Sequence, residues 1–186
     1  DILVAGSGTD HLEGGAGNDT YLANGRDDLY KNTIRDSAGT KDKIQYTGTD
    51  SLRLDRFNGD NGIDIIDVNE RPIIADGDNN HFDFRNARFA DQNQEINVAA
   101  GDDRVYGGRS SEVIRGAAGR DYLEGGGGHD QLFGDGGDDH LVGGTGNDQL
   151  FGGDGVDRLH GNEGNDTLKG ESGNDHLEGG AGKDRL

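Results

Sequence analysis

The sequence predicts an all-β fold, a solenoid of stacked coils, and three observations carry this prediction. Glycine accounts for 36 of the 186 residues, only 29% of the residues are hydrophobic, and a nine-residue pattern runs without a gap through the C-terminal half. The chain has 37 acidic and 18 basic side chains, and its net charge is −19. This composition argues against an ordinary globular enzyme with a side-chain core. Its order must therefore come from the repeat.

The composition also excludes several other classes of protein. A single proline and the lack of glycine at every third position exclude collagen. The acidic balance argues against a nucleic-acid binder, and no apolar run reaches the roughly 18 residues that cross a membrane. The absence of cysteine excludes disulfides and thiolate metal sites. A metal held by oxygen ligands is the remaining way to stabilise so small a core.

Residues 1–31 carry the first copies of the pattern. Its template is G-G-x-G-x-D-x-U-x, where U is a large aliphatic residue. Copies occupy residues 5–13, 14–22 and 23–31, and the third keeps Asp28 and Tyr30 at the key positions. We therefore expect N-terminal repeats over residues 1–31.

Residues 32–97 have lost most of the glycine, since only five glycines remain, and they are rich in isoleucine. Counting nines from Ala5 still places Asp55, Asp64 and Asp91 at position six. We interpret this segment as a degenerate continuation of the solenoid whose turns are filled by side chains. The alternative is a small independent β insert.

Residues 98–186 hold ten copies of the template without insertion or deletion. Position eight is apolar in every copy, at Val105, Ile114, Leu123, Leu132, Leu141, Leu150, Leu159, Leu168, Leu177 and Leu186. Position six is acidic in every copy, at Asp103, Glu112, Asp121, Asp130, Asp139, Asp148, Asp157, Asp166, Asp175 and Asp184. A flexible acidic linker would not hold leucine and aspartate in fixed phase.

The template predicts its own local structure. Positions seven to nine alternate outward, inward and outward, as in a strand, and the glycine-rich positions form a turn. Two copies of the nine-residue template then complete one coil with two facing strands. Stacking brings acidic turns about 4.8 Å apart, which is repulsive unless a cation lies between them. Calcium, which accepts six to eight oxygen ligands in flexible geometry, suits such a place better than magnesium.

The ten copies resemble the calcium-binding nonapeptide of RTX (repeats-in-toxin) proteins, whose fold is the parallel β-roll. The resemblance implies an ion between each turn and the turn two repeats later. The earlier turn gives the carbonyls of positions two and four and its carboxylate, and the later turn gives the carbonyls of positions one and three and its own carboxylate. Six such sites are implied within residues 116–186. Their implied ligands are Ala117, Gly119, Asp121, Gly126, Gly128, Asp130, Gly134, Asp135, Gly136, Gly137, Asp139, Gly143, Gly144, Thr145, Gly146, Asp148, Gly152, Gly153, Asp154, Gly155, Asp157, Gly161, Asn162, Glu163, Gly164, Asp166, Gly170, Ser172, Asp175, Gly179, Ala181 and Asp184.

Three further sites depend on the same resemblance. The pairs Asp103 with Asp121 and Glu112 with Asp130 are doubtful, because Val98-Ala99-Ala100 and Ser110 stand where the template has glycine. One more site is implied near the N-terminus, with ligands Gly6, Gly8, Asp10, Ala23, Gly25 and Asp28. We expect about six to eight calcium ions, and we expect metal binding and folding to be one event.

No catalytic constellation stands out. The sequence has neither HExxH nor G-x-S-x-G, and the repeat already accounts for the paired carboxylates as metal ligands. The six histidines are expected to be solvated surface residues; His140 and His176 lie two coils apart and are not expected to be neighbours. Phe133 and Phe151 point outward from the same face as a possible contact surface, although simple stacking between neighbouring coils is the favoured interpretation.

The resemblance implies a calcium-binding β-roll module of a secreted bacterial protein, exported by a type I secretion system and located outside the cell. Its partners would be calcium ions, the secretion machinery and a neighbouring domain, with no nucleic acid and no membrane span. Two alternatives stay open. The chain could be the accessory part of a secreted enzyme such as a metalloprotease, a lipase or an alginate epimerase, or a segment of a calcium-stiffened adhesin. An RTX toxin is a further possible parent.

Overall fold

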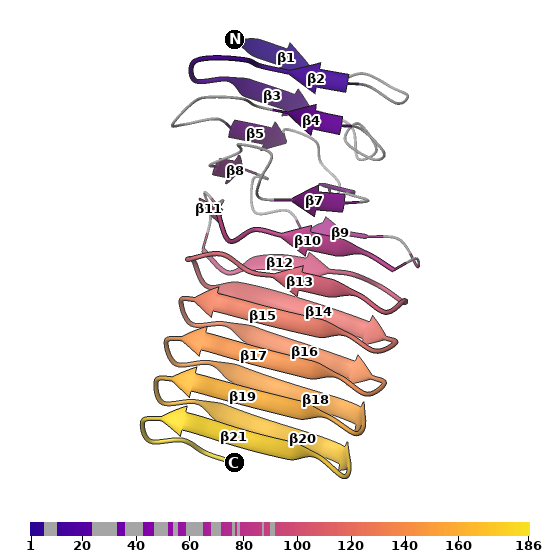
Figure 1. Cartoon of the computed structure of the whole chain (residues 1–186), viewed down its shortest axis with the longest axis vertical. Coiled ribbons are helices and arrows are strands. Elements are labelled where there is room, and N and C mark those ends of the chain that lie inside the picture. The colour runs from indigo at the N-terminus through magenta and orange to yellow at the C-terminus, as the bar shows by residue number, and fades with distance from the viewer. Residues whose placement is uncertain are drawn as a thin grey trace.

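The computed structural model describes residues 1–5, 11–23, 33–35, 43–46, 52–53, 56–58, 65–67, 72–75, 77, 79–86, 88–89 and 92–186. The regular elements among them are all strands, and they stack along one axis (Figure 1). In chain order they are β1 (Ile2–Val4), β2 (His11–Glu13), β3 (Thr20–Ala23), β4 (Thr33–Arg35), β5 (Lys43–Tyr46), β6 (Leu52–Arg53), β7 (Arg56–Asn58), β8 (Ile65–Asp67), β9 (Ile73–Ile74), β10 (His81–Asp83), β11 (Arg88–Phe89), β12 (Gln94–Asn97), β13 (Arg104–Tyr106), β14 (Glu112–Ala118), β15 (Tyr122–Gly127), β16 (Gln131–Gly136), β17 (His140–Thr145), β18 (Gln149–Gly155), β19 (Arg158–Glu163), β20 (Thr167–Gly173) and β21 (His176–Ala181).

The C-terminal coils form two parallel sheets that face each other. One sheet has the order β20-β18-β16-β14-β12-β9-β6 and the other β21-β19-β17-β15-β13-β10-β7. Leu132 pairs with Leu150 in the first sheet, and Leu123 pairs with Leu141 in the second. In both sheets the partner is the equivalent residue two repeats later. The predicted all-β parallel β-roll with 18-residue coils is therefore confirmed for this part of the chain.

The core of the roll is one apolar residue per half-coil. The position-eight side chains from Val105 to Leu168 are 0 or 1% exposed, whereas Leu177 is only partly buried and Leu186 is 67% exposed. Full burial of such a side chain stabilises the fold by about 1.5–3 kcal/mol. A single residue of this size per nine leaves little stability to spare, and the rest of the turn must contribute without side chains.

The turns repeat two backbone conformations that only some residues can adopt. Position two has φ between 61° and 114° and accepts Ala117, Asp135 and Asn162 as well as glycine. Position four has φ between 134° and 147° and is glycine wherever this conformation occurs. The reason is also steric, because a Cβ on Gly137 would overlap the carbonyl oxygen of Gly119 in the preceding coil.

The segment from β5 to β13 builds wider coils with three strands each. The third strand belongs to a separate parallel sheet, in the order β1-β3-β5-β8-β11. Leu52 pairs with Ile73 and Arg56 pairs with His81, so these coils are longer than two nine-residue repeats. The nine-residue frame predicted across residues 32–97 is therefore wrong for the strands described, and its aspartates Asp55, Asp64 and Asp91 lie outside the described residues.

The wider coils need a larger core, and this explains the composition of the segment. Isoleucine and phenylalanine fill it, with Ile44, Ile66, Ile73, Phe82 and Phe84 at 0 or 1% exposure. We propose that residues 32–97 continue the solenoid and are not an independent insert, since β6, β7, β9 and β10 extend the same two sheets as the roll.

At the N-terminus, the pairing of β1 with β3 has the 18-residue spacing of the roll, whereas β2 with β4 and β3 with β5 have longer spacings. Ile2 of β1 pairs with Thr20 of β3, two repeats later in the chain, while β2 pairs with β4 in a separate two-stranded sheet. Tyr21 takes position eight and is fully buried, and its hydroxyl accepts a hydrogen bond from the backbone N–H of Gly14 at 2.9 Å. The described residues contain no helix of the length and apolarity that crossing a membrane requires.

Replacing Gly137 by alanine should destabilise the roll by about 2 kcal/mol or more, because alanine strains the φ of 136° and its Cβ meets the backbone of the preceding coil. The matched control is Asp135→Ala at position two, where Ala117 already adopts the same conformation one coil earlier. Urea unfolding in excess calcium measures both. Equal losses for the two variants would contradict the different roles assigned to positions two and four.

Candidate metal centre

A column of acidic side chains runs along each edge of the roll, at the junction of turn and strand. The position-six carboxylates from Asp121 to Asp166 are only 1 or 2% exposed. Burying a carboxylate away from water is costly unless the charge is paired or removed. The roll repeats this costly feature in every half-coil, and so the carboxylates must have a partner that offsets it.

One oxygen of each carboxylate is held by the backbone of the preceding coil. The N–H of Asp121 donates to Oδ1 of Asp139 at 2.8 Å, and the N–H of Asp130 donates to Oδ1 of Asp148 at 2.9 Å. The same bond, between 2.8 and 3.0 Å long, links each position-six residue to its equivalent two repeats later, from Asp103 to Asp184. It fixes the direction in which the other oxygen points.

The other oxygen is buried and has no hydrogen-bond partner in the described part of the chain. This holds for Oδ2 of Asp121, Asp130, Asp139, Asp148, Asp157 and Asp166. Each of these oxygens lies against the position-one glycine of its own repeat; a Cβ on Gly143, for example, would stand 2.6 Å from Oδ2 of Asp148. Glycine at position one therefore makes the space that the carboxylate occupies.

Backbone carbonyls supply the other oxygens near these turns. The carbonyls of Gly126 and Gly128 lie against Gly144 and Gly146 of the next coil, where no side chain covers them. Within the described residues, no group of three or more His, Cys, Asp or Glu side chains gathers around one point. A cation at these turns would therefore take many of its ligands from carbonyl oxygens, which is a donor set that suits calcium.

Burial raises the pKa of the column carboxyls, and this is the largest effect on them. The pKa rises to about 7 for Asp121 and Asp130 and to about 6 for Asp139 and Asp148. The neighbouring carboxylate one coil away raises each pKa further, while the backbone hydrogen bond lowers it. The metal-free column therefore retains protons to a higher pH than ordinary carboxyls do.

The two pairs that depart from the glycine template, Asp103 with Asp121 and Glu112 with Asp130, differ from each other in the structure. Ala99 and Gly101 have φ of 61° and 136°, the same turn conformation as Ala117 and Gly119, and the N–H of Gly101 donates to the carbonyl of Ala118 at 2.8 Å. The turn before Asp103 thus keeps its form without the first two glycines.

The turn before Glu112 does not keep that form. Neither Gly108 nor Ser110 has a positive φ, and the N–H of Gly108 donates instead to Oε2 of Glu112 at 3.2 Å. Burial raises the pKa of Glu112 to about 9. The longer side chain thus turns back onto its own loop, and its pair with Asp130 departs from the pattern of the other repeats.

The remaining predicted ligands fall into two groups. Gly6, Gly8, Asp10, Gly25 and Asp28 lie outside the described residues. Ala23 is described and is the buried last residue of β3. The residue-by-residue ligand assignment stays a prediction throughout.

The two outward phenylalanines stack on each other. Their ring centroids are 4.9 Å apart at an angle of 5°, with the Arg115 guanidinium 4.0 Å from the Phe133 centroid and the Lys169 ammonium 5.0 Å from the Phe151 centroid. The stack is thus closed by a cation at each end, which favours internal stacking over a contact surface.

The sequence reasoning missed a ring row on the opposite sheet. His160 lies between His140 and His176, with ring centroids 5.2 and 6.2 Å from theirs. The signal was present in the sequence, because His160 occupies position nine while the other two occupy position seven, and both positions face outward.

Comparison with known proteins points to one family. The chain matches the family described as RTX calcium-binding nonapeptide repeat (4 copies) over residues 1–30, 91–123, 98–132, 106–141, 115–150, 133–168 and 151–186. These matches together cover more than half of the chain. A search of curated proteins found no match. The family match, the repeats and the parallel β-roll together show that the chain belongs to the RTX calcium-binding nonapeptide repeat family.

Proposed function

We propose that this calcium-binding repeat module folds when calcium binds, and that it does so outside the cell as part of a secreted bacterial protein. The observation that carries the proposal is the series of buried carboxylate oxygens without a hydrogen-bond donor in the described part of the chain, from Asp121 to Asp166. Such an oxygen needs either a proton or a cation. In calcium-rich surroundings near neutral pH, the cation is the better partner.

The proposed sites lie between turns that are two repeats apart. On one edge the carboxylate pairs are Asp121 with Asp139, Asp139 with Asp157, and Asp157 with Asp175; on the other they are Asp130 with Asp148, Asp148 with Asp166, and Asp166 with Asp184. Carbonyls of positions one to four complete each donor set, as the family resemblance implies. Bound calcium would supply positive charge between the paired carboxylates and would tie successive coils together.

The turn geometry supports a seventh site and argues against an eighth within the roll. Asp103 and Asp121 follow turns of the same conformation, so the substitutions at Ala99 and Ala100 leave the backbone carbonyls available. Glu112 follows a different turn, and we leave its pair with Asp130 out of the proposed set. The site at Asp10 and Asp28 stays a prediction from the sequence. The total remains within six to eight ions.

The charge of the chain supports coupling between calcium binding and folding. A net charge of −19 opposes compaction by self-repulsion, and two charges per ion would offset most of it. Sites with dissociation constants of about 10⁻⁴–10⁻³ M, as in extracellular modules, would stay empty inside the cell and fill outside it. A chain of this kind can pass unfolded through a type I secretion channel and fold afterwards.

Removing calcium should abolish most of the β structure of the C-terminal roll. Calorimetric titration of the chelated protein, with circular dichroism recorded in parallel, should give six to eight calcium ions per chain and a simultaneous gain in β signal. Magnesium at the same concentration should restore little of it. Unchanged circular dichroism in chelator would contradict the coupling of binding and folding.

Replacing Asp148 by asparagine should remove two sites on one edge, because this carboxylate is shared by the pairs with Asp130 and Asp166. We expect the stoichiometry to fall by about two and the calcium midpoint of folding to rise about tenfold. The matched control is Asp154→Asn, whose side chain is exposed at position three and whose implied ligand is the backbone carbonyl, which the variant keeps. The same loss of charge there should leave both quantities nearly unchanged, and an equal effect of the two variants would speak against the assigned ligands.

Calcium-free and calcium-loaded protein should respond to pH in opposite directions. In the folded metal-free roll, the pKa of Asp121 and Asp130 is about 7 and that of Asp139 and Asp148 about 6, against an ordinary value of about 3.9. The stability that comes from protonation is therefore complete below about pH 4 and is lost as the pH rises through 6 to 7.

Calcium-depleted protein should accordingly hold more β structure at pH 5 than at pH 8, whereas protein in limiting calcium should hold less, because protons compete with the metal. Circular dichroism at both pH values, with and without calcium, measures the two slopes. If the β signal changed with pH in the same direction with and without calcium, this would contradict the exchange of protons for calcium at the buried carboxylates.

A further inference from the structure

A continuous row of rings crosses the outer face of the sheet that contains β10, β13, β15, β17, β19 and β21. We name it the ring ladder; its members are His81, Tyr106, Tyr122, His140, His160 and His176. Successive ring centroids are 5.8, 5.5, 5.1, 5.2 and 6.2 Å apart. Each ring leans at 46° to 77° to the next, and so the row is a ridged platform of exposed and half-buried rings.

Two arginines without an ion pair in the described part of the chain stand beside the ladder. Arg104, Tyr122, His140 and Arg158 are register partners on four successive strands. The two arginines therefore lie about 14 Å apart at the usual strand spacing, with two rings between them. Both side chains are exposed, and the Arg104 guanidinium lies 5.7 Å from the Tyr122 ring centroid. Arg120 of the same region differs, because it pairs with Asp102 at 3.9 Å.

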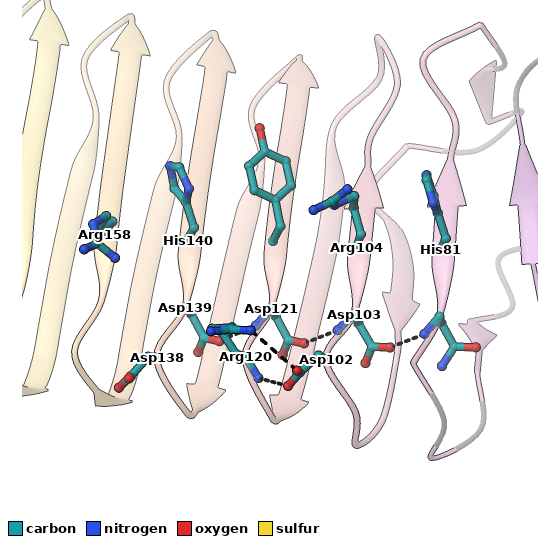
Figure 2. A pocket seen from close by; sticks show the side chains of 12 residues that line it. His81, Asp102, Asp103, Arg104, Arg120, Asp121, Asp138, Asp139, His140 and Arg158 are labelled. Carbon is teal, nitrogen blue, oxygen red and sulfur yellow. Dashed lines mark hydrogen bonds and ion pairs between the residues drawn. The ribbon is translucent and has the colours of Figure 1, made fainter.

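A groove runs beside this row at the edge of the sheet. It has a volume of about 390 Å³, and its lining includes His81, Arg104, His140 and Arg158 together with the buried carboxylates below them. Figure 2 shows these four side chains standing on the strands in one row, with Asp103, Asp121 and Asp139 lined up at the strand ends. The groove thus has a basic and aromatic side and an acidic edge.

Calcium would change the net charge of this groove from negative to positive, and this step rests on the proposed function. Asp103, Asp121 and Asp139 are the carboxylates of the proposed calcium sites on this edge. With calcium bound, the charge of these three carboxylates is offset. Asp102 is paired with Arg120, and Arg104 and Arg158 outnumber the remaining exposed carboxylate, Asp138. An anionic partner would then meet two guanidiniums that can each bind a carboxylate through two hydrogen bonds.

We propose that the ring ladder and its groove bind an acidic glycan, a chain of sugar rings with a carboxylate on some of its residues, when calcium is bound. Aromatic rings offer apolar faces against which the C–H faces of sugar rings can pack. Arg104 and Arg158, which have no ion pair among the described residues, stand on either side of two rings, whereas Arg85, which pairs with Asp83, lies 4.4 Å from the Tyr106 ring centroid. This spacing matches a polymer charged on alternate sugars better than a nucleic acid, which carries one phosphate per nucleotide.

The test uses the full chain in excess calcium and four probes of six units each. They are a hyaluronan hexasaccharide with a carboxylate on alternate sugars, neutral chitohexaose, hexaglutamate and oligo-dT. Calorimetry should show binding of hyaluronan and at least about tenfold weaker binding of the other three. Comparable binding of chitohexaose would overturn the role of the arginines. Comparable binding of hexaglutamate would overturn the role of the rings, and stronger binding of oligo-dT would make the surface a nucleic-acid site.

Three variants locate the binding on the ladder. Arg104→Ala/Arg158→Ala and Tyr122→Ser should each weaken hyaluronan binding about tenfold or more. Arg109→Ala/Arg185→Ala removes the same charge from exposed positions outside the groove and should leave the affinity unchanged. If both double variants weakened hyaluronan binding equally, the binding would depend only on the net charge of the protein, and the proposed site would be overturned.

Calcium stoichiometry and circular dichroism on the same samples separate this inference from the proposed function. A chain that binds calcium and folds but does not bind hyaluronan overturns only the glycan site. A chain that folds without calcium overturns the proposed function and, with it, the calcium dependence of the groove.

Discussion

The buried position-six carboxylate has one oxygen held by a backbone amide two repeats earlier and, from Asp121 to Asp166, a second oxygen with no hydrogen-bond partner among the described residues. Most other features of the roll serve this arrangement. Glycine at position one gives the carboxylate its space, and the turn leaves carbonyl oxygens bare beside it. Because burying the charge is costly, the roll needs a partner for it, and under the proposed function that partner is calcium near neutrality and protons at low pH.

The number of strands per coil follows from what fills the interior. In the roll, one leucine from each wall is enough to close the space between two sheets, and the remaining positions of each nine can be turn. Between β5 and β13, the coils carry three strands, and Ile66, Ile73, Phe82 and Phe84 occupy the larger interior. The column of carboxylates meets this wider part at Asn80, whose N–H donates to Oδ1 of Asp103 at 2.6 Å. An amide residue thus takes the place of the next carboxylate on this edge, and an ordinary side-chain core fills the coils beyond it.

The outer faces of the two sheets have diverged although the inner faces are uniform. On one sheet, Phe133 and Phe151 form a stack that Arg115 and Lys169 close at both ends. On the other, six rings form a longer row, with Arg85 over Tyr106 and Arg104 beside Tyr122. Positions seven and nine contribute nothing to the core, and so they can vary freely while the coil persists. In a repeat of this kind, the residues at positions one, four, six and eight stabilise the fold, and those at positions seven and nine are available for recognition.

The sequence by itself determined the 18-residue coil, the inward leucines, the turn glycines and the columns of position-six acids of residues 98–186. It could do so because an unbroken period makes each residue's partner the equivalent residue two repeats on, and the register then needs no other information. Only the tertiary structure decided the rest. Where the period fails, strand partners depend on contacts far apart in the chain, so the three-strand coils of the central segment could not be read from spacing. The intact turn at Ala99 and the altered one at Ser110 depend on backbone angles that residue type only restricts. The ring ladder joins positions seven and nine of different coils, which become neighbours only when the sheet is formed.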